Sequence, residues 1–360
     1  MKQYDFCRLT SCILIFFTAS LVYSQNKTIK TIAGKNISIN ELECYIQFQM
    51  DTLHIPGLSI AIIDNRSVAY TKNWGVKNLD TQEPVNENTI FEACSLSKPI
   101  FAYFVIKLAH RGVLNINLPL YSYYMDEEVD YSNSLYKQLT ARMILTHCSG
   151  WPNWRDNSDE PLVFRFKPGT QFGYSGEGYQ YLKRILVHQL NTTDSTLDNY
   201  FDEEVCIPLQ TKMMSFVWHD SLSKYKAFGH RAGKPTDNWA HGKADQFDSA
   251  AGMHSTAFDY AKFLIELMDT NKSVTNELLS LQTDLPAESD GNYRSLAFPY
   301  KEIHGKQRFY HSGNNGDARS YCHFYPNEGA GIVLFGNCDN LFSSGFVKNL
   351  LEFLDEEYSY

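Results

Sequence analysis

Segments with strand character lie near both ends of the chain, far apart in the sequence, and this arrangement most constrains the fold. Apolar and β-branched residues fill 58–64 and 67–76, and similar runs return at 308–313, 319–326 and 330–337. The two residues between the first pair of runs are typical of a hairpin. We therefore predict an α+β fold with one antiparallel sheet, built from N- and C-terminal strands and flanked by helices.

The middle of the chain combines helical spacing with many loops. Helical patterns lie at 37–57, 95–111, 139–147, 178–190, 255–269 and about 341–354. With 360 residues the chain exceeds the ~250–300 at which a single core stops growing, so two lobes are expected. We predict a sheet lobe at about 37–92 and 250–360, and an inserted, mostly helical lobe at about 93–249.

Residues 1–24 have the pattern of a cleavable secretory signal. Lys2 and Arg8 precede an apolar run at 12–23. That run is shorter than the ~20 residues that span a bilayer, so we expect no stable membrane span. An uncleaved anchor is the alternative. We expect the mature domain, 25–360, to be periplasmic or secreted.

Charge and cysteine spacing exclude several classes of function. The formal net charge is −9, the pI is about 5.7, and no basic stripe is present, so nucleic acid is not an expected partner. Neither C-x-x-C nor H-E-x-x-H occurs, so we predict no metal site and no cofactor. The cysteines beyond the signal could pair in an exported protein, but isolated buried thiols are the favoured interpretation. They are Cys44, Cys94, Cys148, Cys206, Cys322 and Cys338.

A serine followed three places later by a lysine opens the helical pattern at 95–111. Ser95 and Lys98 would share one helix face, with the hydroxyl at the positive end of the helix dipole. Desolvation disfavours a charged amine, so a buried lysine can accept the proton of a nucleophilic serine. The alternative is a helix-capping serine with a lysine that extends to solvent.

This spacing alone is weakly specific, so the surrounding sequence decides which serine is the candidate nucleophile. Only at Ser95 does it combine a short extended entry, 89–94, with a long apolar helix. The same spacing also occurs at Ser24/Lys27, Ser134/Lys137, Ser221/Lys224 and Ser223/Lys226.

Three short motifs follow one another in a fixed order: "SLSK" at 95–98, "YSG" at 174–176 and "HSG" at 311–313. The segments "IPGLSIAIID", "LTHCSGWP" and "SAAGMHSTAFDYAKF" accompany them. With these features the chain resembles the serine beta-lactamase and DD-peptidase superfamily, on its class C beta-lactamase and penicillin-binding esterase side. The resemblance covers roughly 40–337.

The resemblance implies a role for a tyrosine beside the serine and lysine. Tyr174 would share the base work with Lys98 and then protonate the leaving group. Tyr131, in "YSN", matches the usual Tyr-x-Asn more literally. It precedes "LTHCSGWP", however, whereas the family places its tyrosine after that segment. We therefore favour Tyr174 over Tyr131; a tyrosine in the core is the structural alternative.

The third motif implies substrate-binding positions. His311 would bind or orient a substrate carboxylate, and Gly313 would let the substrate approach the backbone closely. The backbone N–H groups of Ser95 and Asn314 would form the oxyanion hole. A structural histidine on a strand is the alternative for His311.

Gly176 stands where the family has an asparagine, whose side chain would touch the lysine and the substrate amide. We predict an exported serine hydrolase acting through an acyl-enzyme on Ser95, with an ester, a D-amino-acid peptide or a beta-lactam as its small-molecule or peptide substrate. Cell-wall fragments are among the candidates. The alternative is a catalytically degenerate protein that binds cell-wall peptide or penicillin. A Ser-His-Asp hydrolase would need G-x-S-x-G, and "GYSGE" at 173–177 lacks the last glycine.

Overall fold

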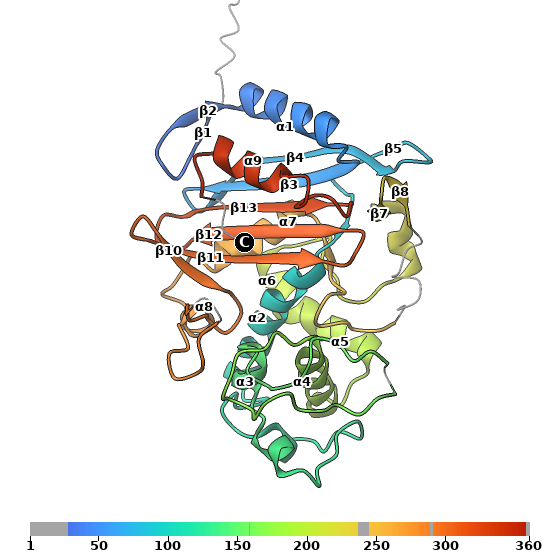
Figure 1. The fold of residues 1–360 in the computed structure, drawn as a ribbon, viewed down its shortest axis with the longest axis vertical. Coiled ribbons are helices and arrows are strands. Elements are labelled where there is room, and N and C mark those ends of the chain that lie inside the picture. The colour runs from blue at the N-terminus through green and yellow to red at the C-terminus, as the bar shows by residue number, and fades with distance from the viewer. Residues whose placement is uncertain (1–27, 158, 237–244, 289–290, 358–360) are drawn as a thin grey trace, which may run out of the picture.

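A seven-stranded antiparallel sheet forms the centre of the molecule (Figure 1). The computed structural model describes residues 28–157, 159–236, 245–288 and 291–357, so the predicted signal at 1–24 lies outside the described residues. The strand order is β10-β11-β12-β13-β3-β4-β5. The strands are β3 (Gly57–Asp64), β4 (Ser67–Asn78), β5 (Glu83–Pro84), β10 (Tyr300–Ile303), β11 (Lys306–Asn314), β12 (Arg319–Tyr325) and β13 (Ala330–Gly336).

The N-terminal and C-terminal strands meet in the middle of this sheet, which confirms the predicted α+β fold. β13 pairs antiparallel with β3, and Ala61 lies opposite Val333. Side chains alternate between the faces of a strand. Leu58 and Ile60 accordingly belong to the core under one face, whereas Ala61 and Ile63 belong to the core under the other.

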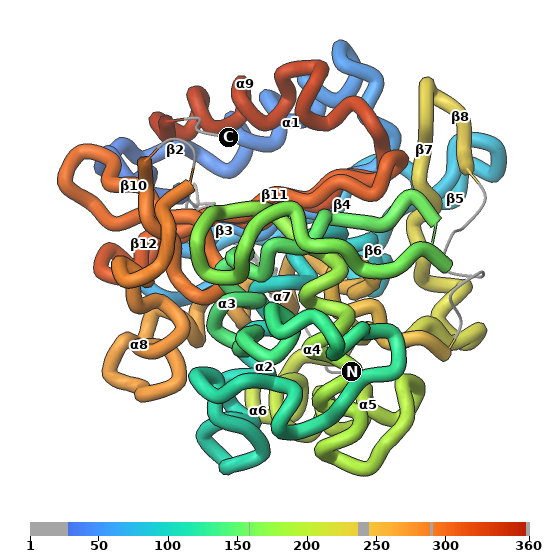
Figure 2. Tube along the Cα trace, turned by 60° about the horizontal axis from the view of Figure 1, so that its bottom comes forward, coloured from blue at the N-terminus to red at the C-terminus, as the bar shows by residue number. Residues whose placement is uncertain are grey.

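Helices cover both faces of the sheet. α1 (Ile39–Leu53) and α9 (Phe346–Phe353) lie together over one face, as Figures 1 and 2 both show. α7 (Ala257–Glu266) contacts β3, β4 and β13 on the opposite face. The remaining α-helices of the described residues are α2 (Ser97–His110), α3 (Ala141–Leu145), α4 (Gly176–Gln189), α5 (Asp194–Phe201), α6 (Ile207–Leu209) and α8 (Ser273–Leu279). α3, α4 and α5 lie farthest from α1 and α9 (Figure 1).

α2 is buried on almost every side, which places it at the junction between the sheet and the other helices. Its residues from Ser97 to Ile106 are all buried, as a helix that is apolar around most of its circumference requires. It ends at His110, and Gly112 follows with a φ of 80°, the left-handed conformation common after a helix.

Among the residues that the structure describes, three two-stranded ladders complete the fold, and one of them holds two parts of the site together. They are β1 (Thr28–Lys30) with β2 (Asn36–Ser38), β6 (Phe91–Glu92) with β9 (His254–Ser255), and β7 (His230–Arg231) with β8 (Lys234–Pro235). The β6–β9 pair fixes the chain just before Ser95 beside the segment around Ala250.

Candidate active site

Ser95 lies in a tight turn between β6 and α2. Ala93 N–H donates to the carbonyl oxygen of Met253 at 2.8 Å, which continues the β6–β9 ladder. Cys94 is fully buried and has a φ of 51°, in the left-handed region that non-glycine residues seldom occupy. A 3-10 turn, Cys94–Leu96, then carries the half-buried Ser95.

The helix predicted to begin at Ser95 begins instead at Ser97. The Ser97 hydroxyl donates to the carbonyl oxygen of Cys94 and accepts the N–H of Met253 at 3.1 Å. These two contacts hold the preceding residues in the tighter 3-10 turn. Ser95 and Lys98 nevertheless remain on the same side of the chain.

Contact with Lys98 makes Ser95 a candidate nucleophile. Its side chain is buried, with a residue exposure of 1%, and Nζ lies 3.4 Å from Ser95 Oγ. Nζ also donates to the carbonyl oxygen of Ala250 at 2.8 Å. The lysine therefore does not extend to solvent, and its amine lies beside the serine hydroxyl.

Tyr174 lies next to the same amine. Lys98 Nζ is 4.7 Å from the centre of the Tyr174 ring. The Tyr174 ring packs against His147, with ring centroids 4.1 Å apart, and the His147 Nδ1 accepts the N–H of Ser175 at 3.1 Å. Tyr131 lies elsewhere: its hydroxyl accepts the Asp126 N–H at 2.9 Å and contacts the Tyr181 hydroxyl at 3.3 Å.

His311 completes this row of side chains, with its ring centroid 6.4 Å from that of Tyr174. Burial lowers the pKa of His311 to about 3, and the positive charges of Arg294 and Lys98 act in the same direction. The imidazole is therefore neutral at pH 7. Because Nδ1–H donates to the Ser312 carbonyl oxygen at 2.8 Å, Nε2 is left as an acceptor, which gives no electrostatic attraction for a carboxylate.

Gly313 brings β11 close to the turn that holds Ser95. A Cβ at this position would lie 2.6 Å from Cys94 Cβ and 2.9 Å from the backbone nitrogen of Ser95. Atoms of Cys94 and Ser95 therefore occupy the space that the absence of a side chain at Gly313 leaves. Asn314 follows at the end of β11 and lines a hollow in front of Ser95.

That hollow has a volume of about 370 Å³ and brings together residues from four parts of the chain. Sequence reasoning missed several of them, because they lie in loops or contribute backbone atoms. The lining residues are Ser95, Lys98, Asn153, Trp154, Asp248, Ala251, Asn314 and Asn315. Asn153 and Trp154 directly follow the "LTHCSGWP" segment, which was the available signal for them.

Gly176 forms the first residue of α4. Its N–H donates to both the carbonyl oxygen and the side-chain Oδ1 of Asn153, each at 3.0 Å. The Ser175 side chain caps the helix by accepting the N–H of Gly178 at 3.0 Å. Ser175 is therefore occupied as a cap.

A buried ion pair supports the wall of the hollow that Asn315 forms. Lys226 Nζ lies 2.9 Å from Glu92 Oε1, and the two side chains are 0% and 2% exposed. The second carboxylate oxygen of Glu92 accepts from Asn315 Nδ2 at 2.9 Å. Asn315 also donates to the Ala251 carbonyl oxygen at 3.3 Å, so these charges fix the loop after β11.

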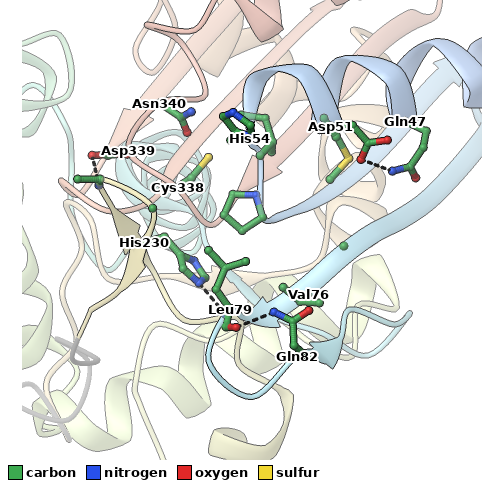
Figure 3. Close-up of a pocket in the computed structure, with 16 residues that line it drawn as sticks. Gln47, Asp51, His54, Val76, Leu79, Gln82, His230, Cys338, Asp339 and Asn340 are labelled. Atoms are coloured by element: carbon green, nitrogen blue, oxygen red, sulfur yellow. Dashed lines mark hydrogen bonds between the residues drawn. The ribbon is translucent and has the colours of Figure 1, made fainter.

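A second, larger hollow of about 860 Å³ shares no lining residue with the first (Figure 3). Its polar groups bind one another. His230 Nε2 accepts the N–H of Leu79 at 3.1 Å, and Gln82 donates to the Leu79 carbonyl oxygen (Figure 3). Gln47 likewise donates to Asp51 at 2.9 Å. The other ring nitrogen of His230 binds the Asn337 carbonyl oxygen at 2.8 Å, so both nitrogens of this imidazole are engaged by backbone groups.

The described part of the chain contains neither a metal-ligand cluster nor a disulfide. There, no cluster of three or more His, Cys, Asp or Glu residues could hold a metal ion. Cys44 is exposed, and none of the six described cysteines forms a disulfide. The five buried cysteines are Cys94, Cys148, Cys206, Cys322 and Cys338.

Comparison with known proteins assigns the chain to a family. The beta-lactamase family profile matches residues 42–355. This chain is a member of the beta-lactamase family. The resemblance inferred from the three motifs is thereby confirmed.

Relatives of this beta-lactamase-family chain are distant in sequence. It is 25% identical over 345 residues to protein flp of Staphylococcus aureus strain MW2, covering 89% of this chain and 67% of that protein. It is 24% identical over 226 residues to a beta-lactamase of Yersinia enterocolitica, covering 60% of this chain and 55% of that one.

Two solved structures share the fold. A class C beta-lactamase superposes with a TM-score of 0.73 at 17% identity, covering 89% of this chain and 96% of the other. The octameric penicillin-binding protein homologue from Pyrococcus abyssi superposes with a TM-score of 0.70 at 20% identity, covering 88% and 78%. The beta-lactamase-family serine hydrolase fold is thus established for this chain.

Proposed function

We propose that this protein is a serine hydrolase that works through an acyl-enzyme on Ser95. The observation that carries the proposal is the pair formed by Ser95 and the buried Lys98, with 3.4 Å between Oγ and Nζ. A lysine removed from water beside a serine hydroxyl is suited to act as its base.

The proposed reaction has two steps. The amine form of Lys98 takes the Ser95 proton while Oγ forms a bond to the substrate carbonyl carbon. The bond to the leaving group then breaks, Tyr174 gives its hydroxyl proton to that group, and Lys98 returns a proton to Tyr174. In the second step Lys98 and Tyr174 take a proton from water as its oxygen bonds to the acyl carbon. The bond between that carbon and Ser95 Oγ then breaks, and the same proton passes to Oγ. The negative oxygen formed in each step is assigned to the N–H groups of Ser95 and Asn314.

The substrate proposed is an ester, a D-amino-acid peptide or a beta-lactam. The Gly176 position favours esters, because a glycine offers no carboxamide to a substrate amide, and an ester has the better leaving group. The neutral His311 supports the same preference, since it adds no positive charge for a terminal carboxylate. A binding protein without turnover is not favoured, because Lys98 lies beside Ser95 and Tyr174 lies beside Lys98.

We propose in addition that the protein is exported, on the strength of the signal pattern at 1–24. Within the described residues, no helix is long and apolar enough to cross a membrane. N-terminal sequencing of exported material tests this: the mature chain should begin at or near Gln25. Full-length protein retained in membranes would contradict it.

Covalent labelling tests the nucleophile. A fluorophosphonate or penicillin probe should modify Ser95, identified by mass spectrometry of the labelled peptide. Ser175 is the matched internal comparison, because it lies near the same tyrosine but caps α4. Modification at Ser175 or Ser312, or none at all, would overturn the proposal.

A further inference from the structure

The second hollow, between the end of α1, the end of β4 and the segment after β13, has the size and lining of a ligand site (Figure 3). Its volume of about 860 Å³ lies within the range of about 300–1,000 Å³ that small-molecule sites have. Its lining includes the buried side chains of Met50, Ile55 and Cys338. The Cys338 thiol is no nucleophile, because burial raises its pKa to about 12. The hollow therefore suits a ligand with an apolar body.

Two carboxylates, Asp51 and Asp339, lie on opposite sides of this hollow (Figure 3). Each uses one oxygen for a contact within the protein. Asp51 Oδ1 accepts from Gln47 Nε2 at 2.9 Å, and Asp339 Oδ2 accepts the N–H of Ala232 at 3.0 Å. Neither carboxylate forms an ion pair with a residue that the structure describes, so the second oxygen of each is available to a cation.

Lysine and arginine are absent from the described residues that line this hollow. Burial lowers the pKa of His230, so that imidazole brings no positive charge at pH 7. The last turn of α1 holds no basic residue, and the C-terminal end of a helix carries a partial negative charge. The two carboxylates and the end of α1 therefore attract a cation together.

The positions of these charges indicate which kind of cation fits. Two carboxylates are too few for an ion such as calcium, which takes about 6–8 oxygen ligands, and the described residues contain no metal-ligand cluster. A single ammonium group reaches only one side of the hollow. A linear diamine carries an ammonium group at each end of an apolar chain, which matches carboxylates on two sides of an apolar hollow.

We propose that this hollow binds a linear aliphatic diamine, with one ammonium group on Asp51 and the other on Asp339. Each ammonium group donates to the carboxylate oxygen that is not used within the protein, and the methylene chain packs against Met50 and Ile55. The hollow shares no lining residue with the one beside Ser95. This binding site is therefore independent of the proposed hydrolase function.

NMR titration of the full protein with 1,6-diaminohexane, 1,8-diaminooctane and 1,10-diaminodecane tests the proposal. Each diamine is compared with the monoamine of the same length at pH 8, above the ordinary histidine pKa of about 6.5. We expect at least one diamine to bind about 3–5-fold more tightly than its monoamine, as one added ion pair at a partly exposed site predicts. The neutral diol of that length should bind more weakly than either amine. If no diamine binds more tightly than its monoamine, the proposal is wrong.

Asp51→Asn and Asp339→Asn locate the two ammonium groups. Asparagine keeps an oxygen for the contact with Gln47 or Ala232 but removes the negative charge. Each variant should lower the ratio of the monoamine and diamine dissociation constants to about 1, because only one carboxylate remains. A variant that keeps the full ratio would show that its carboxylate does not bind the ligand, and the two-sided site would then be wrong.

Asp284→Asn is the matched control. Asp284 is exposed and does not line the hollow, so its replacement changes the net charge equally at another place on the surface. It should leave the ratio unchanged. A general attraction of cations to a protein with a net charge of −9 would instead weaken equally in all three variants, and that result would overturn the proposal. Binding of tetralysine without binding of any diamine would also overturn it, since the hollow would then belong to a basic protein segment.

Discussion

Lys98 Nζ donates a hydrogen bond to the carbonyl oxygen of Ala250 at 2.8 Å, across 152 residues of sequence. This contact commits one N–H of the amine and holds Nζ at 3.4 Å from Ser95 Oγ. A lysine side chain otherwise has many rotamers, and ordering it in advance lowers the entropy lost when the substrate reacts.

Removing the Lys98 amine should abolish most turnover without unfolding the protein. Lys98→Met keeps an unbranched side chain in the buried space but has no proton acceptor. We expect kcat/KM for phenyl acetate to fall at least ~10²-fold, and Tyr174→Phe to have a similar effect. Tyr131→Phe is the control, since its hydroxyl contacts Asp126 and Tyr181. If Tyr131→Phe were the damaging change, the wrong tyrosine would have been chosen.

An asparagine at position 176 should help only after Trp154 has been shortened. The motif comparison alone predicts that Gly176→Asn raises amide turnover relative to ester turnover, by about 10-fold. A Cβ there would lie 2.7 Å from two outer ring carbons of Trp154 and 3.0 Å from the carbonyl oxygen of Asn153, so the single variant should lose melting temperature and activity unless the exposed indole moves away. Gly176→Asn combined with Trp154→Ala should recover both and raise the ratio of cephalosporin to ester turnover. A stable, active single variant would show that the loop moves aside easily.

Removing one partner of the buried Lys226–Glu92 pair should strongly destabilise the protein. Lys226→Met leaves the Glu92 carboxylate, 2% exposed, without its cation, and we expect the free energy of unfolding to fall by about 3–5 kcal/mol. Lys72→Met is the control. Lys72 pairs with Glu43 at the surface, with side chains 39% and 29% exposed, so its loss should change stability by about 0–1 kcal/mol. Urea unfolding measures both, and similar losses would contradict this assignment.

Stability should fall as the pH drops below about 6.5. Burial lowers the pKa of His147 and His254 well below the ordinary value, and that of His311 to about 3. Between these values and 6.5 the unfolded chain binds protons that the folded chain does not. Folding therefore loses about 1.4 kcal/mol per pH unit for each such histidine.

Urea midpoints at pH 7 and pH 5 measure this effect. His311→Gln should reduce the difference between the two midpoints, because it removes the contribution of one buried histidine. His304→Gln should not, because the His304 side chain is 85% exposed. Equal midpoints at pH 7 and pH 5 in the wild type would show that these histidines already carry protons when folded.

Regular elements could be predicted from sequence because they depend on local periodicity. Runs of apolar and β-branched residues predicted β3, β4, β11, β12 and β13, and helical spacing predicted α2 and α4. β10 was missed, since Tyr300–Ile303 is a short edge strand with two charged residues among four. The start of α2 was also misplaced, because the hydrogen bonds of Ser97 to distant backbone atoms hold the 3-10 turn.

The candidate site was predictable only where a side chain and a motif coincide. Ser95, Lys98 and Tyr174 could be named because their motifs follow one another in order. The Ala250 carbonyl could not, because a backbone oxygen has no signature and reaches Lys98 only through the β6–β9 ladder. Asn153 lies in a loop, and its hydrogen bond with the Gly176 N–H joins it to a helix that begins 23 residues later, a contact that no local pattern predicts.

The pairing of β3 with β13 has a consequence for how the protein is made. The two central strands of the sheet lie far apart in the sequence, so β13 is synthesised long after β3, and β11, which places Gly313 beside Ser95, also follows β3 at a long interval. Until β13 arrives, the apolar edge of β3 has no partner and is open to pairing with other chains. Folding must then close a very long loop, which is slow. We expect a nascent chain that ends before β13 to be inactive and to aggregate or bind chaperones, as measured by pull-down of stalled ribosome complexes. Catalytic competence therefore depends on synthesis having passed β13.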